Sequence, residues 1–378
     1  MQLVFNVFST LIVFVVSFLF SAYIVRFYKS EIANHQSNRF GAIDGLRGYL
    51  ALSVFIEHYV TTYYWKTQGE WRRPPEQYFE NFGTVGVAIF FMITGFLFVS
   101  KVMQNKEVDW VKLFKSRVFR IYPLYLFCVL IVVIVSFYDS RFSLRVSGYE
   151  LFIQFMAWIL YYGEEINGYK DTVLIIASVA WTLKYEWLFY ISLPAIRFVI
   201  KKGWPLILIA SIGIVILFFK KLTLYHVSSD YFILFLIGGC VAWLRVSYQD
   251  RLTIINTPLI SIFALIAYVA ALWLDDTYRL AHIALMSLFF LCVALGNTLF
   301  GLFSNKVSIF LGEISFSIYL VHGIILYFLF SMFFSDIVKY LSLSEFLLFM
   351  PLTSLFVILC SWMTFTCIEA PVMKFGKK

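Results

Sequence analysis

Long apolar segments dominate this sequence and limit what it can fold into. Of its 378 residues, 61% are hydrophobic and 14% are charged, whereas soluble globular proteins are about 25% charged. A helix needs about 20 apolar residues to cross the roughly 30 Å hydrocarbon core of a bilayer. We therefore predict an all-α, polytopic integral membrane protein with about eleven transmembrane helices. The predicted spans are 3–25, 43–64, 82–101, 119–138, 173–196, 203–219, 230–246, 253–274, 280–303, 308–334 and 346–368.

One further apolar segment, 149–162, is shorter than the others. Lys and Arg are enriched in the inner loops of membrane proteins. If the N-terminus is outside and 149–162 does not cross, 19 Lys and Arg residues lie inside and 10 outside, whereas a crossing gives 15 and 14. The first arrangement has the stronger bias, so we predict that 149–162 is a re-entrant or interfacial helix on the outer face. The first span is expected to be retained, because basic residues follow it instead of preceding it.

The second predicted span carries ionisable residues. Arg47 and His58 are eleven residues apart, which places them on one helix face at levels separated by roughly 16 Å. Asp44 and Glu57 accompany them. A charge at the centre of a lipid-facing helix costs roughly 2.5–3.5 kcal/mol on insertion scales, so this face is predicted to line a protein interior or a wet cavity. His58 is suited to proton transfer near neutral pH, and the alternative is a histidine that only bridges helices.

A polar face also follows the span 173–196, because Thr182, Glu186 and Tyr190 recur at four-residue spacing. The helix would enter from outside and place Glu186 near mid-membrane. Lys184 in the same span is expected to pair with a carboxylate or to extend toward the interface. The alternative is a glutamate that only holds helices together.

A third polar face consists of Ser315, Tyr319 and His322 in the tenth predicted span. That helix would enter from inside, so His322 is expected at a depth similar to that of His58. Three helices would then bring His58, Glu186 and His322 to one level. A buried active site or a permeation path requires such a convergence of polar groups in a membrane.

A basic stretch, which includes Lys115, Arg117 and Arg120, lies where the inner connection 102–118 meets the next span. Arginine recognises phosphate through two parallel hydrogen bonds. The stretch therefore predicts contact with a phosphorylated ligand, and the alternative is ordinary anchoring by inner positive charges.

The remaining composition argues against several other kinds of protein. Because the cysteines all lie in apolar segments and none forms a Cys-x-x-Cys motif, we expect neither a disulfide framework nor a metal site. The net charge of +8 is attributed to inner loops and not to a nucleic-acid-binding surface. The cysteines are Cys128, Cys240, Cys292, Cys360 and Cys367.

Taken in order, the polar segments resemble the acyltransferase 3 family of bacterial membrane O-acyltransferases, from about Arg39 to the C-terminus. The resemblance rests on an Arg-x10-His element, a Val-x-x-Phe-Phe-x-x-(Ser/Thr)-Gly-Phe segment and an Arg-x-x-Arg-Ile-x-Pro-x-Tyr segment. It continues through Trp-(Ser/Thr)-Leu-x-x-Glu, Ser-x-x-x-Tyr-Leu-x-His and a Glu-x-Pro tail. These segments begin at Arg47, Val87, Arg117, Trp181, Ser315 and Glu369.

The resemblance implies a ten-helix core with both ends inside, which agrees with eleven spans if the first helix is an addition. We thus expect residues 1–38 to form an extra N-terminal helix and inner loop, and 39–378 to form the acyltransferase domain. The resemblance further implies acyl transfer from acyl-CoA inside to a saccharide hydroxyl outside. His58 would be the catalytic histidine, and Arg117 and Arg120 would contact the nucleotide phosphates.

We therefore expect an acetyl-CoA-dependent O-acetyltransferase of a cell-surface polysaccharide or its lipid-linked precursor, in the bacterial cytoplasmic membrane. We expect membrane lipids around the protein and neither nucleic acid nor a metal as a partner. The sequence leaves open whether the protein forms a homo-oligomer. The expected catalytic residues are His58, Arg47 and Glu186, those binding the donor are Arg117, Arg120 and Lys115, and those binding the acceptor are Trp181, Ser315, Tyr319, His322 and Glu57. The alternatives are an exporter of an acylated glycolipid through the same cavity, and a structural partner in a polysaccharide assembly complex.

Overall fold

The computed structural model describes residues 2–27, 41–104, 107–224, 226–248, 255–275 and 277–377. Within these residues, six helical stretches are long and apolar enough to cross a membrane, and three shorter apolar helices accompany them. The fold is therefore all-α with several membrane spans, as predicted, but the number eleven is not confirmed. The six stretches are Leu3–Phe27, Gln77–Gln104, Trp110–Asp139, Ser229–Tyr248, Ser315–Phe333 and Met350–Gly376.

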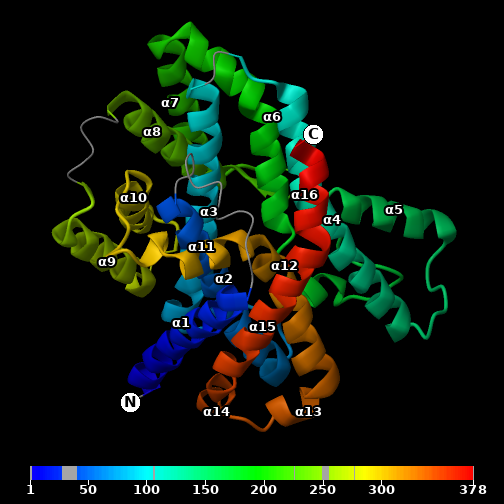
Figure 1. The fold of residues 1–378 in the computed structure, drawn as a ribbon. Coiled ribbons are helices and arrows are strands. Elements are labelled where there is room, and N and C mark those ends of the chain that lie inside the picture. Colours follow the sequence, from blue (N-terminus) through cyan, green and yellow to red (C-terminus); the bar gives the residue numbers. More distant parts are fainter. Residues whose placement is uncertain are drawn as a thin grey trace.

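Helices make up most of the described chain, and the single small sheet pairs two short antiparallel strands (Figure 1). The first half contains α1 (Gln2–Phe27), α2 (Gly41–Gln68), α3 (Gln77–Gln104), α4 (Trp110–Asp139), α5 (Gly148–Ile159), the 3₁₀ helix η2 (Thr172–Ile176), α6 (Trp181–Lys202), α7 (Trp204–Lys220), β1 (Thr223–Leu224) and β2 (Val227–Ser228). The second half contains η3 (Ser229–Tyr231), α8 (Phe232–Tyr248), α9 (Pro258–Trp273), α10 (Leu280–Ala294), η5 (Leu302–Ser304), α11 (Lys306–Glu313), α12 (Ser315–Tyr327), the π-helical η6 (Phe328–Phe333), α13 (Ser335–Val338), α14 (Leu343–Leu348), α15 (Met350–Thr364), the π-helical η7 (Phe365–Glu369) and α16 (Ala370–Lys377).

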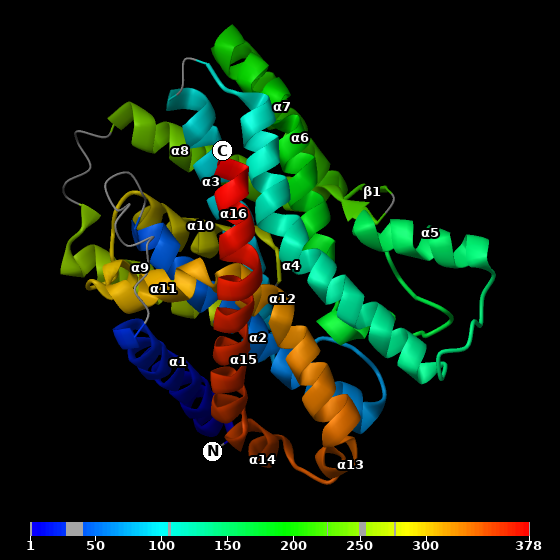
Figure 2. The same cartoon turned by 45° about the vertical axis from the view of Figure 1, so that its right-hand side comes forward.

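Helix α2 lies in the middle of the molecule and packs against α3, α11 and α12 (Figures 1 and 2). Two glycines of α3 allow the close approach of α2. A Cβ atom at Gly83 would lie 2.8 Å from Oε2 of Glu57, and one at Gly86 would lie 3.0 Å from the side chain of Val54. The glycines therefore bring α3 against the polar face of α2.

Two predicted spans are interrupted. In 173–196, α6 begins only after a 3₁₀ turn and after Ala177 and Ser178, whose φ angles are 49° and 57°. The span 308–334 is divided at Ile314 into α11 and α12, which run in different directions in Figure 2. Both segments are mainly apolar and as long as a membrane span, so their composition alone indicates an unbroken helix.

Two other spans differ at their ends. Helix α10 ends at Ala294 instead of continuing to 303, because Gly296 adopts a φ of 124° that a helix does not accommodate. The predicted span 346–368 is built from α14, α15 and a π-helical turn. Pro351 stands in the first turn of α15, where its missing N–H costs nothing.

The basic stretch is helical and does not belong to a long loop. Asp109 caps α4, since its side chain accepts a hydrogen bond from the backbone N–H of Lys112 at 2.9 Å. The helix therefore begins well inside the connection predicted over 102–118. Arg117 and Arg120 consequently project from the early turns of α4.

The segment 149–162 forms α5, whose 12 residues span about 18 Å. That length is well below the roughly 30 Å of a bilayer core. Figures 1 and 2 show α5 lying across the direction of α4 and α6, with Tyr149, Phe152 and Ile153 exposed. This geometry supports an interfacial helix. The inner loop expected up to residue 38 lies outside the described residues.

Candidate active site

Two histidines from helices far apart in the sequence are in contact in the core. Nδ1 of His58 on α2 lies 2.9 Å from Nε2 of His322 on α12, and His322 is completely buried. The neighbouring Gly323 lets the chain before α6 pass closely over α12, because a Cβ there would lie 2.4 Å from the carbonyl carbon of Ile176. The break before α6 is thereby packed against the histidine pair.

The hydrogen bonds assign the ring protons of the neutral pair. Nδ1 of His322 lies 2.9 Å from the carbonyl oxygen of Ile318, and a carbonyl only accepts, so this Nδ1 carries the proton. Nε2 of His322 is then bare and accepts from Nδ1–H of His58. The Nε2 atom of His58 is left without a proton, as a base or a nucleophile requires.

Glu57 is the nearest acidic group to that nitrogen. Its Oε2 lies 3.2 Å from Nε2 of His58, and its Oε1 accepts a hydrogen bond from the hydroxyl of Thr61 at 3.0 Å. The absence of a side chain at Gly83 leaves room for this carboxyl group. Beside a bare Nε2 this carboxyl group is protonated and donates to it. Once His58 has taken up a proton, the carboxylate stabilises the imidazolium.

The histidine borders a cavity of about 190 Å³, called the His58 cavity from here on. The ring of Trp71 stacks on His58 with centroids 5.9 Å apart, and Arg73 forms a salt bridge of 2.7 Å with Glu80 across the lining. Tyr231 contributes a further aromatic wall. Neither Trp71 nor Arg73 is among the site residues predicted from the sequence, although the polar connection after α2, with its Trp-Arg-Arg-Pro-Pro run, was the available signal.

A second, smaller cavity of about 50 Å³, the Arg47 cavity, lies near the N-terminal end of α2. Glu186 faces it and accepts a hydrogen bond of 2.9 Å from the hydroxyl of Tyr190. Within the described chain no hydrogen bond or salt bridge holds the guanidinium of Arg47. Arg47 and Arg117 lie close enough to Glu186 to interact with its carboxylate electrostatically, so this end of the site is rich in positive charge.

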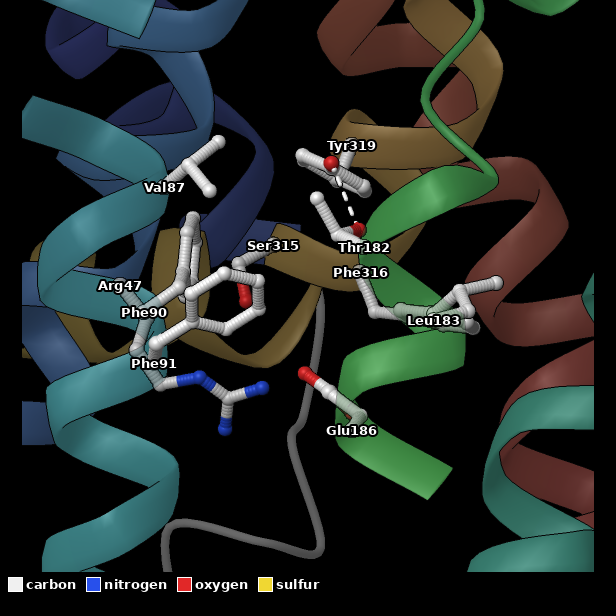
Figure 3. A pocket seen from close by; sticks show the side chains of 10 residues that line it. All are labelled: Arg47, Val87, Phe90, Phe91, Thr182, Leu183, Glu186, Ser315, Phe316 and Tyr319. Atoms are coloured by element: carbon white, nitrogen blue, oxygen red, sulfur yellow. Dashed lines mark hydrogen bonds between the residues drawn. The ribbon is translucent and has the colours of Figure 1, made fainter. Parts of the chain in front are cut away.

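Val87 and Tyr319 line both cavities. The hydroxyl of Tyr319 lies 2.8 Å from Oγ1 of Thr182, which ties α12 to α6. In Figure 3, Val87 and Tyr319 lie at one end of the Arg47 cavity, and Arg47 and Glu186 lie at the other. The side chains of Val87 and Tyr319 therefore separate the two cavities.

Residues 40–365 match the family model described as an acyltransferase domain. This chain belongs to the acyltransferase 3 family. It is also 27% identical over 317 residues to a protein of Acidianus two-tailed virus named "putative acetyltransferase ORF330", a match that covers 78% of this chain and 87% of that protein. No solved structure matches the chain. The family predicted from the ordered motifs is confirmed, and the protein is a multi-pass membrane acyltransferase.

In this acyltransferase the predicted site residues form two groups. The His58 cavity is formed with His58, Glu57, Trp181 and Tyr319 and is supported by His322, whereas the Arg47 cavity contains Arg47, Glu186, Ser315 and again Tyr319. Glu186, which was expected at the level of His58 and His322, lines a different cavity from His58, and Tyr319 lines both cavities. Arg47 likewise does not contact His58, since about 16 Å of α2 separates them.

Arg120 of this acyltransferase forms a buried salt bridge. Its Nη1 lies 3.1 Å from Oε2 of Glu369, and the carboxylate is completely buried. The hydroxyl of Ser317 donates to the other carboxylate oxygen of Glu369. This cluster joins α4, α12 and the π-helical turn η7, so the guanidinium of Arg120 is already engaged where a phosphate contact was expected.

Arg117 and Lys115 of the acyltransferase remain accessible. The Arg117 guanidinium lies 5.2 Å from the centre of the Phe98 ring, and Lys115 is exposed on α4. Arg117 acts electrostatically on Glu186 of the Arg47 cavity, whereas Lys115, two residues earlier on α4, lies on another side of the helix. Among the described residues no group of three or more His, Cys, Asp or Glu side chains is placed to hold a metal ion.

Proposed function

We propose that this protein transfers an acetyl group from acetyl-CoA on the inner side of a bacterial cytoplasmic membrane to a hydroxyl of a saccharide or lipid-linked glycan on the outer side. The observation that carries the proposal is the bare Nε2 of His58 in the wall of one cavity, which Val87 and Tyr319 separate from a second cavity that contains Arg47. One cavity is cationic and lies toward the start of α2. The other is aromatic and lies toward the end of α2.

The Arg47 cavity suits the donor. Within the described chain no hydrogen bond or salt bridge engages the Arg47 guanidinium, which acts electrostatically on the carboxylate of Glu186. Arg47 and Arg117, with Lys115 on the same helix as Arg117, would hold the phosphates of acetyl-CoA. The acceptor oxygen would attack the thioester carbonyl carbon of the donor, the C–S bond would break, and the thiolate of CoA would leave and take the proton that His58 removed from the acceptor. Because Val87 and Tyr319 separate the cavities, they would define the passage through which the acyl group reaches His58.

The His58 cavity suits the acceptor. Nε2 of His58 would remove the proton from the acceptor hydroxyl, while His322 keeps the ring in the tautomer that leaves this nitrogen bare. Glu57 would stabilise the imidazolium, and Trp181 and Tyr319 would position the acceptor. A route in which Nε2 carries the acyl group transiently uses the same nitrogen.

The experiment uses the purified protein in nanodiscs with radiolabelled acetyl-CoA and a panel of saccharide acceptors. We expect saturable acetyl-CoA binding and acetyl transfer, with slow hydrolysis of acetyl-CoA when water is the only acceptor. An exporter of acylated glycolipid needs no donor, so absence of both binding and turnover would reject the proposal in favour of transport. The His58→Ala variant serves as the chemical control.

A further inference from the structure

A third cavity, of about 260 Å³, adjoins the His58 cavity. Ser178 and Trp181 line both of them, so the two spaces are neighbours across the break before α6. The walls of the third cavity come largely from α5, from the residues that follow it and from the first turn of α6, including the aromatic side chains of Trp158 and Tyr161. The space therefore extends the acceptor side of the site.

Lys184 brings a positive charge to this cavity. The residue is only 9% exposed, and its Nζ lies 4.6 Å from the centre of the Tyr162 ring. Within the described chain no hydrogen bond or salt bridge engages this ammonium group. The acidic group that acts on it electrostatically is Glu164, which also lines the cavity and whose side chain is 79% exposed to solvent. A buried ammonium without an anionic partner is costly, and such a residue marks a ligand site in a membrane protein.

Trp158 is buried in the wall of the third cavity. The residue is 2% exposed, and its indole Nε1 is closed to solvent and has no hydrogen-bond partner in the described structure. The hydroxyl of Tyr125 fixes the Trp158 backbone by donating to its carbonyl oxygen at 2.6 Å. Gly163 packs against the indole, because a Cβ there would lie 2.1 Å from the Trp158 ring. Trp158 therefore shapes the cavity, and Lys184 supplies its ammonium donor.

We propose that this cavity is an anion subsite for the acceptor, in which Lys184 holds a carboxylate or phosphate of an acidic glycan. The sugar next to the acidic unit would then lie in the His58 cavity. The inference rests on the proposed function for the identity of the acceptor, but the binding of an acidic sugar by Lys184 is testable without acyl transfer. An oxyanion compensates the buried ammonium, whereas a neutral hydroxyl leaves the charge uncompensated.

The binding experiment uses the purified protein in nanodiscs of neutral phosphatidylcholine. The probes are methyl glucuronoside and glucose 1-phosphate, with methyl glucoside as the neutral reference, and the readouts are calorimetric affinity and ligand-induced thermal stabilisation. We expect at least one acidic probe to bind about 10-fold or more tightly than the neutral one, as a charge-assisted hydrogen bond permits. Lys184→Gln should abolish this preference, Lys184→Arg should retain part of it, and Lys170→Gln, which removes an exposed lysine outside the cavity, should not change it.

A second variant and a comparison with nanodiscs of anionic lipid complete the test. Glu164→Gln, which removes the carboxylate that lines the cavity and acts on Lys184, should strengthen binding of the acidic probe. Equal affinity for acidic and neutral probes in the wild type, or a preference that Lys184→Gln leaves unchanged, overturns the proposal. Lys184-dependent stabilisation by phosphatidylglycerol nanodiscs, without any preference among the sugars, assigns the charge to a lipid headgroup and also overturns it. These readouts hold even if acetyl transfer is not detected.

Discussion

His58 and His322 are separated by 264 positions in the sequence, yet their ring nitrogens lie 2.9 Å apart. In this contact His58 is the donor and His322 the acceptor, because the Ile318 carbonyl fixes the proton of His322 on its Nδ1 atom. His322 is thus a positioning residue that determines which nitrogen of His58 faces the cavity without a proton. The relationship explains why a second buried histidine accompanies the reactive one.

Replacing His322 with alanine is expected to lower kcat about 100-fold or more, because His58 loses the acceptor that fixes its tautomer and the benefit of general base catalysis is of that order. His322→Gln should retain intermediate activity, since its amide oxygen accepts a hydrogen bond from Nδ1–H of His58. The measurement is kcat for acetyl transfer with KM determined in parallel. Full kcat in His322→Ala would remove this residue from the mechanism.

Val87 is expected to control the length of the acyl group. Val87→Ala opens the contact between the two cavities, and we predict that the ratio of kcat/KM for butyryl-CoA to that for acetyl-CoA rises about 10-fold, as one or two methylenes in an apolar passage allow. Val87→Leu should lower the ratio. The matched control is Val85→Ala, since Val85 is a buried valine of the same helix that lines neither cavity. An unchanged ratio in both Val87 variants would contradict this role.

Arg120 and Glu369 are expected to affect stability. Arg120→Met leaves the fully buried carboxylate of Glu369 without its cation, which costs about 3–5 kcal/mol for a broken buried pair. The double change Arg120→Met with Glu369→Gln should recover most of the loss, because no uncompensated charge remains. Thermal unfolding in detergent checks both variants, and an equal Tm for the single variant and the wild type would show that the pair is dispensable.

Arg47 and Arg117 are expected to affect donor binding and not stability. Substitution of either by glutamine should raise KM for acetyl-CoA about 10-fold or more, since a hydrogen bond to a charged group contributes about 1.5–3 kcal/mol. The Tm should change little. Lys202→Gln, which removes an exposed basic residue at the end of α6, is the control. Normal donor affinity in both arginine variants would place the acetyl-CoA phosphates elsewhere.

The sequence was sufficient to predict the helical membrane fold and the family, and it placed His58 and His322 at a similar depth. Apolar length and the spacing of polar residues along a helix carry that information. They do not show where an apolar segment breaks. The left-handed residues Ala177 and Ser178 lie inside such a segment, and the sequence does not show that Glu186, which follows them on α6, faces the Arg47 cavity.

Contacts between distant segments could not be predicted from the sequence. Arg120 has the position of a phosphate ligand on α4, but its partner Glu369 lies 249 positions later, a pairing that only the packing of the C-terminal π-helical turn against α4 creates. Trp71 follows α2 in a polar connection, and nothing in its spacing indicates that its ring returns to stack on His58. In both cases the sequence shows the chemistry of the side chain, but it does not show which distant residue the side chain contacts.

His58 is proposed to accept the proton of the acceptor through Nε2, or to carry the acyl group there, in a site that still binds the donor without this side chain. The most direct test compares acetyl transfer and acetyl-CoA affinity of wild type and His58→Ala in nanodiscs. We predict a fall in kcat of about 100- to 10,000-fold, the range of general base catalysis, with donor affinity and Tm nearly unchanged. Transfer at the wild-type rate by His58→Ala would contradict the proposed role of His58.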